Sequence, residues 1–174
     1  MTSFPAKKIA YLAIMAALAI VLGLATSFLP NFSLTLAFYF LLSVFSGLAS
    51  GWSVMLVAVL ASNLRTGIGP WTLFQIIAYS CLLLLWYGYT RSDFIKKIWL
   101  SALVAAGLAF TFGFWNALLN VPFYHLPNFW VYYLQGLPFD ASLCLATGLG
   151  YWLMARYLLP IMIHRLPEMA RSKR

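Results

Sequence analysis

The sequence predicts an all-α integral membrane protein with six transmembrane helices. Of its 174 residues, 64% are hydrophobic and only 8% are charged, whereas about a quarter of the residues in a soluble domain are charged. No charged side chain occurs between Ile9 and Leu64, a stretch long enough for more than two crossings of about 20 residues each. These observations exclude a soluble globular domain and a disordered chain.

Prolines, glycines and polar residues divide the apolar stretches into spans. Pro30 and Asn31 end the first, Gly47 and Gly51 mark a reversal between the second and third, and a polar turn at Gly69 precedes the fourth. A charged loop over 91–97 comes before the fifth span, and an aromatic-rich loop over 121–138 comes before the sixth. We therefore expect one domain, residues 1–174, with helices over 8–28, 34–49, 51–64, 71–89, 98–120 and 139–163.

The lysines and arginines predict the orientation, since positively charged loops stay on the cytoplasmic side. Only Arg65 falls on the external side of a six-span arrangement. We expect both termini in the cytoplasm and a multi-pass location in a prokaryotic plasma membrane. Because this segregation accounts for the net charge of +8, no nucleic-acid partner is implied. The cations on the cytoplasmic side are Lys7, Lys8, Arg91, Lys96, Lys97, Arg165, Arg171, Lys173 and Arg174, with Arg156 near the same boundary.

Several classes of function are not expected, because the sequence lacks the motifs that they require. The chain has no G-x-x-x-x-G-K-[ST] phosphate loop, so it is not expected to hydrolyse ATP. His125 and His164 fall on opposite sides of the membrane, which argues against a shared metal. Ion-coupled carriers typically contain buried acidic residues within the membrane. Here Asp140 is the one carboxylate near a crossing, so a self-powered carrier is not expected. We expect no catalytic centre, metal or cofactor.

The first helix carries a stripe of small residues. Ala6, Ala10, Ala13 and Ala17 follow one another at steps of four, three and four, which keeps them on one helical face. Small residues allow close helix approach in lipid. This face could pack inside the chain or could receive a second membrane protein, and the pattern alone leaves both interpretations open.

Several short motifs resemble the substrate-binding S-component of an energy-coupling factor (ECF) type vitamin transporter. They are the Lys-Lys start with Ala13-x-x-x-Ala17, the Gly69-Pro70-Trp71 start of the fourth helix with Gln75 after it, and Gly136-Leu137-Pro138-Phe139-Asp140 at the sixth. The resemblance covers nearly the whole chain. It implies that a vitamin is captured outside, and that an EcfT-type transmembrane coupling protein with two ATPase subunits drives the S-component to topple and release it. By the same resemblance, Ala10, Ala13 and Ala17 form the docking face.

Three predicted helices place polar and aromatic side chains near the external side, where they could line a substrate pocket. A polar residue in a membrane helix must find a partner, so the alternative is that these side chains only tie helices together. Aromatic residues of the external loops could form a rim, although rings at bilayer interfaces also serve as anchors. The candidate substrate-binding residues are Arg65, Trp71, Gln75, Tyr79, Trp115, Asn116, Asn120, Tyr124, His125, Tyr132, Asp140, Cys144 and Thr147.

The charge on the external side restricts the substrate. With Arg65 as the one external cation, a polyanionic vitamin is not expected. A neutral, amide-bearing, ring-rich molecule fits better, with cobalamin or a related corrinoid first and riboflavin or another flat vitamin second. Two alternatives from other functional classes stay open. One is an intramembrane enzyme that uses Asp140 and Cys144, and the other is a purely structural membrane subunit.

Overall fold

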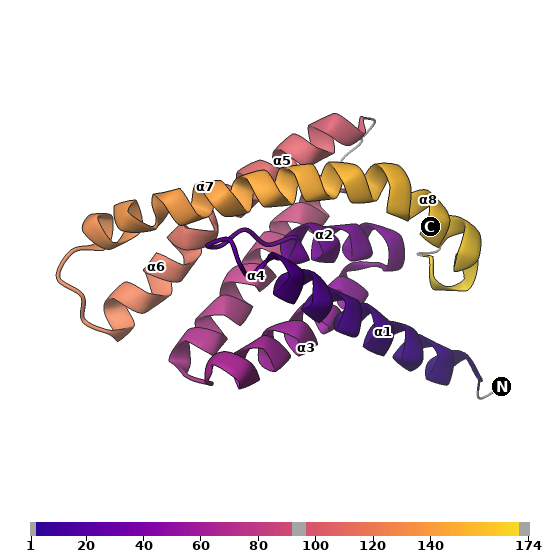
Figure 1. Cartoon of the computed structure of the whole chain (residues 1–174), viewed down its shortest axis with the longest axis horizontal. Helices are drawn as coiled ribbons and strands as arrows, with labels where there is room; N and C mark the ends of the chain where they lie inside the picture. Colours follow the sequence, from indigo (N-terminus) through magenta and orange to yellow (C-terminus); the bar gives the residue numbers. More distant parts are fainter. Residues whose placement is uncertain (1–2, 92–96, 171–174) are drawn as a thin grey trace.

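The computed structural model describes residues 3–91 and 97–170, and every regular element within them is helical (Figure 1). A π-helical turn, Met154–Leu158, joins the last two α-helices without a break, and a short 3₁₀ turn, Pro167–Met169, follows them. The α-helices are α1 (Ser3–Thr26), α2 (Thr35–Ser46), α3 (Leu48–Thr66), α4 (Pro70–Tyr89), α5 (Ile98–Phe110), α6 (Phe112–Phe123), α7 (Phe129–Leu153) and α8 (Leu159–Arg165).

Four helical stretches of the described chain are long and apolar enough to cross a membrane, and α2 is apolar but shorter. This confirms the all-α class and is compatible with a multi-pass membrane protein. The number of six crossings remains a prediction. The four stretches are Ala6–Thr26, Leu48–Arg65, Pro70–Tyr89 and Ile98–Phe123.

The central helix of the bundle is α2, which packs against α1, α3, α4 and α7. Its side chains from Leu36 to Ser43 are all buried, as expected for a helix that is hydrophobic all round. Trp86 of α4 stacks on Phe40 with ring centroids 4.7 Å apart and donates from Nε1 to the Phe40 carbonyl over 3.1 Å. The core therefore lies around α2, and the other helices surround it.

Many large apolar side chains stay exposed on the surrounding helices. Ile14 on α1, Leu103 on α5 and Leu145 on α7 are each about 60% exposed, at 63%, 60% and 62%. An exposed apolar surface of this kind is unfavourable in water. A hydrocarbon environment accounts for it, because lipid tails are as apolar as leucine.

The fifth predicted span is interrupted. Instead of one helix over 98–120, the chain forms α5 and α6, separated at Thr111. The Thr111 side chain and backbone both donate to the Leu108 carbonyl, over 2.8 Å and 3.0 Å. The backbone N–H of Gly113 donates to Asp140 Oδ1 over 3.0 Å. A carboxylate from another helix therefore caps the start of α6, a role that sequence spacing does not reveal.

The predicted loop over 121–138 is wrong for most of its length. Helix α6 continues to Phe123, and α7 begins at Phe129, ten residues before the start predicted for the sixth span. Asn128 caps α7 by accepting from the Val131 N–H over 3.2 Å, which is an ordinary N-cap contact. Pro122 and Pro138 lie inside helices and do not mark the ends of a loop.

The connections gather at two ends of the bundle (Figure 1). At one, which we call the terminal end, Lys7 Nζ lies 3.4 Å from Glu168 Oε2 and Tyr11 Oη lies 2.8 Å from Ser46 Oγ. At the other, the loop end, lie the connections 27–34, 67–69 and 124–128. Asn31 Nδ2 donates to the Phe139 carbonyl there over 3.0 Å. The described parts of the N- and C-terminal segments thus share one end.

Candidate binding site

A polar pocket of about 300 Å³ lies among α1, α2, α3 and α4 at the loop end. We call it the α3/α4 pocket. Three of the predicted substrate-binding residues line it, Arg65 from α3 and Gln75 and Tyr79 from α4. The structure adds polar residues that the sequence analysis did not single out, namely Ser33, Thr35, Ser62 and Asn63.

An amide bridge joins α3 to α4 inside this pocket. Asn63 Nδ2 donates to Gln75 Oε1 over 2.9 Å and to the Val59 carbonyl over 2.9 Å. Gln75 therefore does tie two helices together, as the alternative interpretation expected. The bridge uses the oxygen of Gln75 and leaves its amide nitrogen for another acceptor. Arg65 is exposed at the rim, where a guanidinium can meet a carboxylate.

A second pocket of about 300 Å³ lies between α6 and α7, and we call it the α6/α7 pocket. Three further predicted residues, Asn116, Tyr132 and Asp140, line it. Aromatic rings and neutral amides supply much of the remaining wall. Those residues include Asn31, Phe112, Tyr133, Gln135 and Phe139.

Asp140 is the charged residue of this second pocket, and only 2% of it is exposed. Its Oδ1 accepts from the Gly113 N–H, and its Oδ2 has no hydrogen-bond partner among residues 3–91 and 97–170. The carboxylate lies so close to Gly113 that an added Cβ there would overlap it. Gly113 is thus required by the close approach of α7, and one carboxylate oxygen remains unsatisfied at a cost.

A pair of rings separates the two pockets. Tyr79 lines the α3/α4 pocket and Phe112 lines the α6/α7 pocket, and their ring centroids are 4.6 Å apart. Tyr39 also meets Tyr79 edge-on, with ring centroids 6.0 Å apart. The connection 27–34 also touches both, since Ser33 lines the first pocket and Asn31 the second. The two pockets are therefore neighbours.

The remaining candidates on α4 and α6 do not line either pocket. Trp71 is 42% exposed, and its ring folds back over Gly69 so closely that a Cβ at Gly69 would overlap it. Asn120 donates to the Asn116 carbonyl over 2.8 Å, within its own helix. Trp115 packs against the core, and its Nε1 has no partner in the described part of the chain.

The loop residues proposed as a rim lie at the end of α6. Tyr124 is 43% exposed and meets Phe74 and Phe123 edge-on, with centroids 6.5 Å and 5.0 Å away. His125 is exposed and has a left-handed backbone, with φ of 50°. Both residues lie at the loop end, but neither lines a pocket described above.

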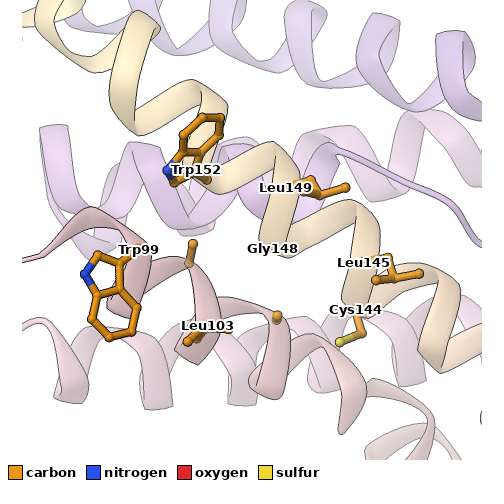
Figure 2. Close-up of a pocket in the computed structure, with 9 residues that line it drawn as sticks. Trp99, Leu103, Cys144, Leu145, Gly148, Leu149 and Trp152 are labelled. Carbon is orange, nitrogen blue, oxygen red and sulfur yellow. The ribbon is translucent and has the colours of Figure 1, made fainter.

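The stripe expected along the sixth span is divided between two surroundings. Thr147 is fully buried, and its hydroxyl has no partner within the described ranges. Cys144 instead lines an apolar groove of about 640 Å³ between α5 and α7 (Figure 2). Trp99, Leu103 and Trp152 line the same groove. Cys144 therefore lies away from the polar pockets.

The alanines of α1 also separate into two groups. Ala16 and Ala19 are buried in the core, at 3% and 0% exposure. Ala10, Ala13 and Ala17 are exposed. Internal packing thus explains the first pair, while the predicted docking face lies open in the described structure.

Metal ligands do not gather in the described ranges, where no group of three or more His, Cys, Asp or Glu side chains could hold an ion. The sequence pattern did not indicate Asn63, Gly113 and Asn31 as site residues, because their roles depend on contacts with other helices. Asn63 offered a weak signal, a polar residue just before the turn at Gly67.

Comparison of the chain with models of protein families, with curated proteins and with solved structures found no match.

Proposed function

We propose that this chain is the substrate-binding S-component of an ECF-type vitamin importer. The observation that carries the proposal is the pair of pockets at the loop end, whose walls meet where the Tyr79 and Phe112 rings are in contact. Small-molecule sites are mostly apolar, with a few polar groups that fix orientation. The amides and rings around these pockets fit that description.

The proposed orientation follows from charge. The described cations Lys7, Lys97, Arg156 and Arg165 fall on the cytoplasmic side of the six-span arrangement, and Arg65 falls on the other. The loop end then faces outward and the terminal end faces the cytoplasm. In this orientation the pockets open to the side from which an importer takes its substrate.

The pocket volumes bear on which vitamin is bound. Each pocket, at about 300 Å³, lies at the lower limit for small-molecule sites. A flat vitamin such as riboflavin suits a space of this size with stacking rings. Cobalamin, a macrocycle with an attached nucleotide, is larger than either pocket and requires a wider conformation of the site. The shape of this conformation therefore favours the flat vitamin, and cobalamin is the second candidate.

Transport in this proposal needs a partner. The exposed face of Ala10, Ala13 and Ala17 is the docking surface for the transmembrane coupling protein, with two ATPase subunits supplying energy. Small side chains let a second helix approach closely in lipid. The absence of a phosphate loop from the sequence agrees with this division of labour.

Thermal unfolding of the detergent-purified chain with a panel of vitamins tests the proposal. The panel includes riboflavin, cobalamin, thiamine, biotin and folate. A ligand that binds only the folded state raises the melting temperature, by a free energy of about 2.7 kcal/mol at a hundred times its Kd. We expect one member of the panel to stabilise the chain, and replacement of Tyr79 by Ala to remove that effect.

Two results would oppose the proposal. Absence of stabilisation by every vitamin would favour a structural subunit. A ligand that is chemically converted, with conversion lost in Asp140→Asn, would favour an intramembrane enzyme. The control is Trp71→Ala, because Trp71 lies outside both pockets and its loss should leave ligand stabilisation unchanged.

A further inference from the structure

A fourth cavity, distinct from the proposed vitamin site, lies at the terminal end of the bundle. It is a groove of about 720 Å³ between α1 and the segment 164–169, and we call it the terminal groove. Its α1 wall includes Lys7, Ala10, Ile14 and Met15, so it borders the proposed docking face at Ala10, and its other wall includes Arg165 and Met169. The groove thus combines charged and apolar side chains in one space.

The charges of the groove favour an anion. Lys7 and Arg165 are cations, Glu168 is the opposing acid, and the remaining titratable groups of the lining are His164 and Tyr11. Lys7 and Glu168 form an ion pair of 3.4 Å, with side chains 58% and 60% exposed. Exposed pairs of this kind contribute little, so an anionic ligand can replace Glu168 as the partner of Lys7.

The polar and apolar parts of the groove are arranged along the helix axis. Ile14 lies seven positions after Lys7, a distance of about 10 Å at a rise of 1.5 Å per residue. Ile14 is 63% exposed. The cation therefore lies toward the end of α1, and the exposed apolar wall begins further along it. A phospholipid has the same order, with a charged headgroup followed by acyl chains.

We propose that the terminal groove binds an anionic phospholipid, with its phosphate at Lys7 and Arg165 and an acyl chain along Ile14 and Met15. Basic pockets between membrane helices on the cytoplasmic side suit such headgroups. The inference does not depend on vitamin transport. It requires only that the chain lies in a bilayer.

Thermal unfolding in a mild detergent with added lipid tests the inference. The probes are dioleoyl phosphatidylglycerol, the zwitterion dioleoyl phosphatidylcholine, and water-soluble glycerol phosphate. We expect phosphatidylglycerol to raise the melting temperature more than the other two. Native mass spectrometry should retain one bound phosphatidylglycerol on the full chain.

Charge variants identify the site. In Lys7→Gln with Arg165→Gln, affinity for phosphatidylglycerol should fall about fivefold for each cation removed. A charge-matched control, Lys97→Gln with Arg156→Gln, changes two exposed cations outside the groove and should keep the original affinity. The control separates a localised site from general attraction between a basic protein and an anionic lipid.

Glu168→Gln separates lipid binding from a purely structural ion pair. If a phosphate competes with Glu168 for Lys7, this variant should bind phosphatidylglycerol more tightly, opposite in sign to Lys7→Gln. Equal effects of the two variants would show that the pair only fastens the C-terminal segment to α1. The inference would also be overturned if phosphatidylcholine raised the melting temperature as much as phosphatidylglycerol does. The same holds if glycerol phosphate alone gave the full effect.

Discussion

Asp140 shows how one side chain can serve both packing and a cavity wall. Its Oδ1 caps the start of α6 through the Gly113 N–H, while its Oδ2 is left without a partner among the described residues. A carboxylate at a helix N-terminus is favoured by the helix dipole. The contact holds α6 against α7 and, at the same time, places the acid in the wall of the α6/α7 pocket.

Gly113→Ala should therefore destabilise the chain. The new methyl group overlaps the Asp140 carboxylate, which can move aside only by giving up its bond to the Gly113 N–H. We expect a loss of about 1–3 kcal/mol in the free energy of unfolding, measured by detergent-induced denaturation.

Two further variants check the cause of that loss. Gly107→Ala, in α5 with no atom within 4 Å of the new Cβ, should be neutral or stabilising by up to about 1 kcal/mol. In an Asp140→Ala background the cost of Gly113→Ala should shrink. An unchanged cost in that background would mean that the carboxylate is not the obstacle.

At the scale of elements, the contact of α5 with α7 is the most extensive in the described structure. It depends on small residues, since a Cβ on Gly148 would lie 2.9 Å from Ala106 Cβ and 3.5 Å from the Ala102 carbonyl oxygen. Close helix approach through small residues is a common means of association in membranes. The same approach places Gly148 in the wall of the apolar groove (Figure 2).

Gly148→Leu should push α5 and α7 apart. We expect a destabilisation of about 1–3 kcal/mol from overpacking, measured in the same denaturation assay. Gly88→Leu on α4 is the matched control, because a Cβ at Gly88 meets no atom within 4 Å. If both variants lose equal stability, the cost comes from the loss of glycine itself and not from the helix contact.

At the scale of the whole molecule, the two ends of the bundle differ in charge and in the pockets that lie there. The proposed orientation predicts that a membrane-impermeant maleimide reaches His125→Cys from outside intact cells. Lys97→Cys should react only after the cells are permeabilised, since this position lies on the side with most of the cations. Both variants are made with Cys81 and Cys144 replaced by Ala, because these are the two free thiols of the chain.

Labelling of both positions from the same side would contradict the six-span arrangement. Reaction of Lys97→Cys alone in intact cells would retain the arrangement and invert it in the membrane. The assay thus tests whether the segment between residues 97 and 125 crosses the membrane and in which direction.

The sequence by itself determined the class of the protein and the approximate position of its first helices. The apolar composition predicted an all-α membrane protein, Pro30 lies within the connection 27–34, and Gly47 and Pro70 lie at the ends of observed helices. These features are local, because hydropathy and backbone restriction act within a few residues of the chain. For that reason they can be inferred from sequence without knowledge of distant contacts.

Only the tertiary structure decided how the helices divide and where the candidate site lies. The interruption at Thr111 goes with a hydrogen bond from Gly113 to Asp140, 27 positions away in the chain. Helical periodicity grouped Asp140 with Cys144, but packing against α5 placed the thiol in the apolar groove. The partition of Gln75, Tyr79 and Asp140 between two pockets likewise depends on which helices meet. Such contacts are long-range, and side-chain spacing within one helix does not specify the helix that will face it.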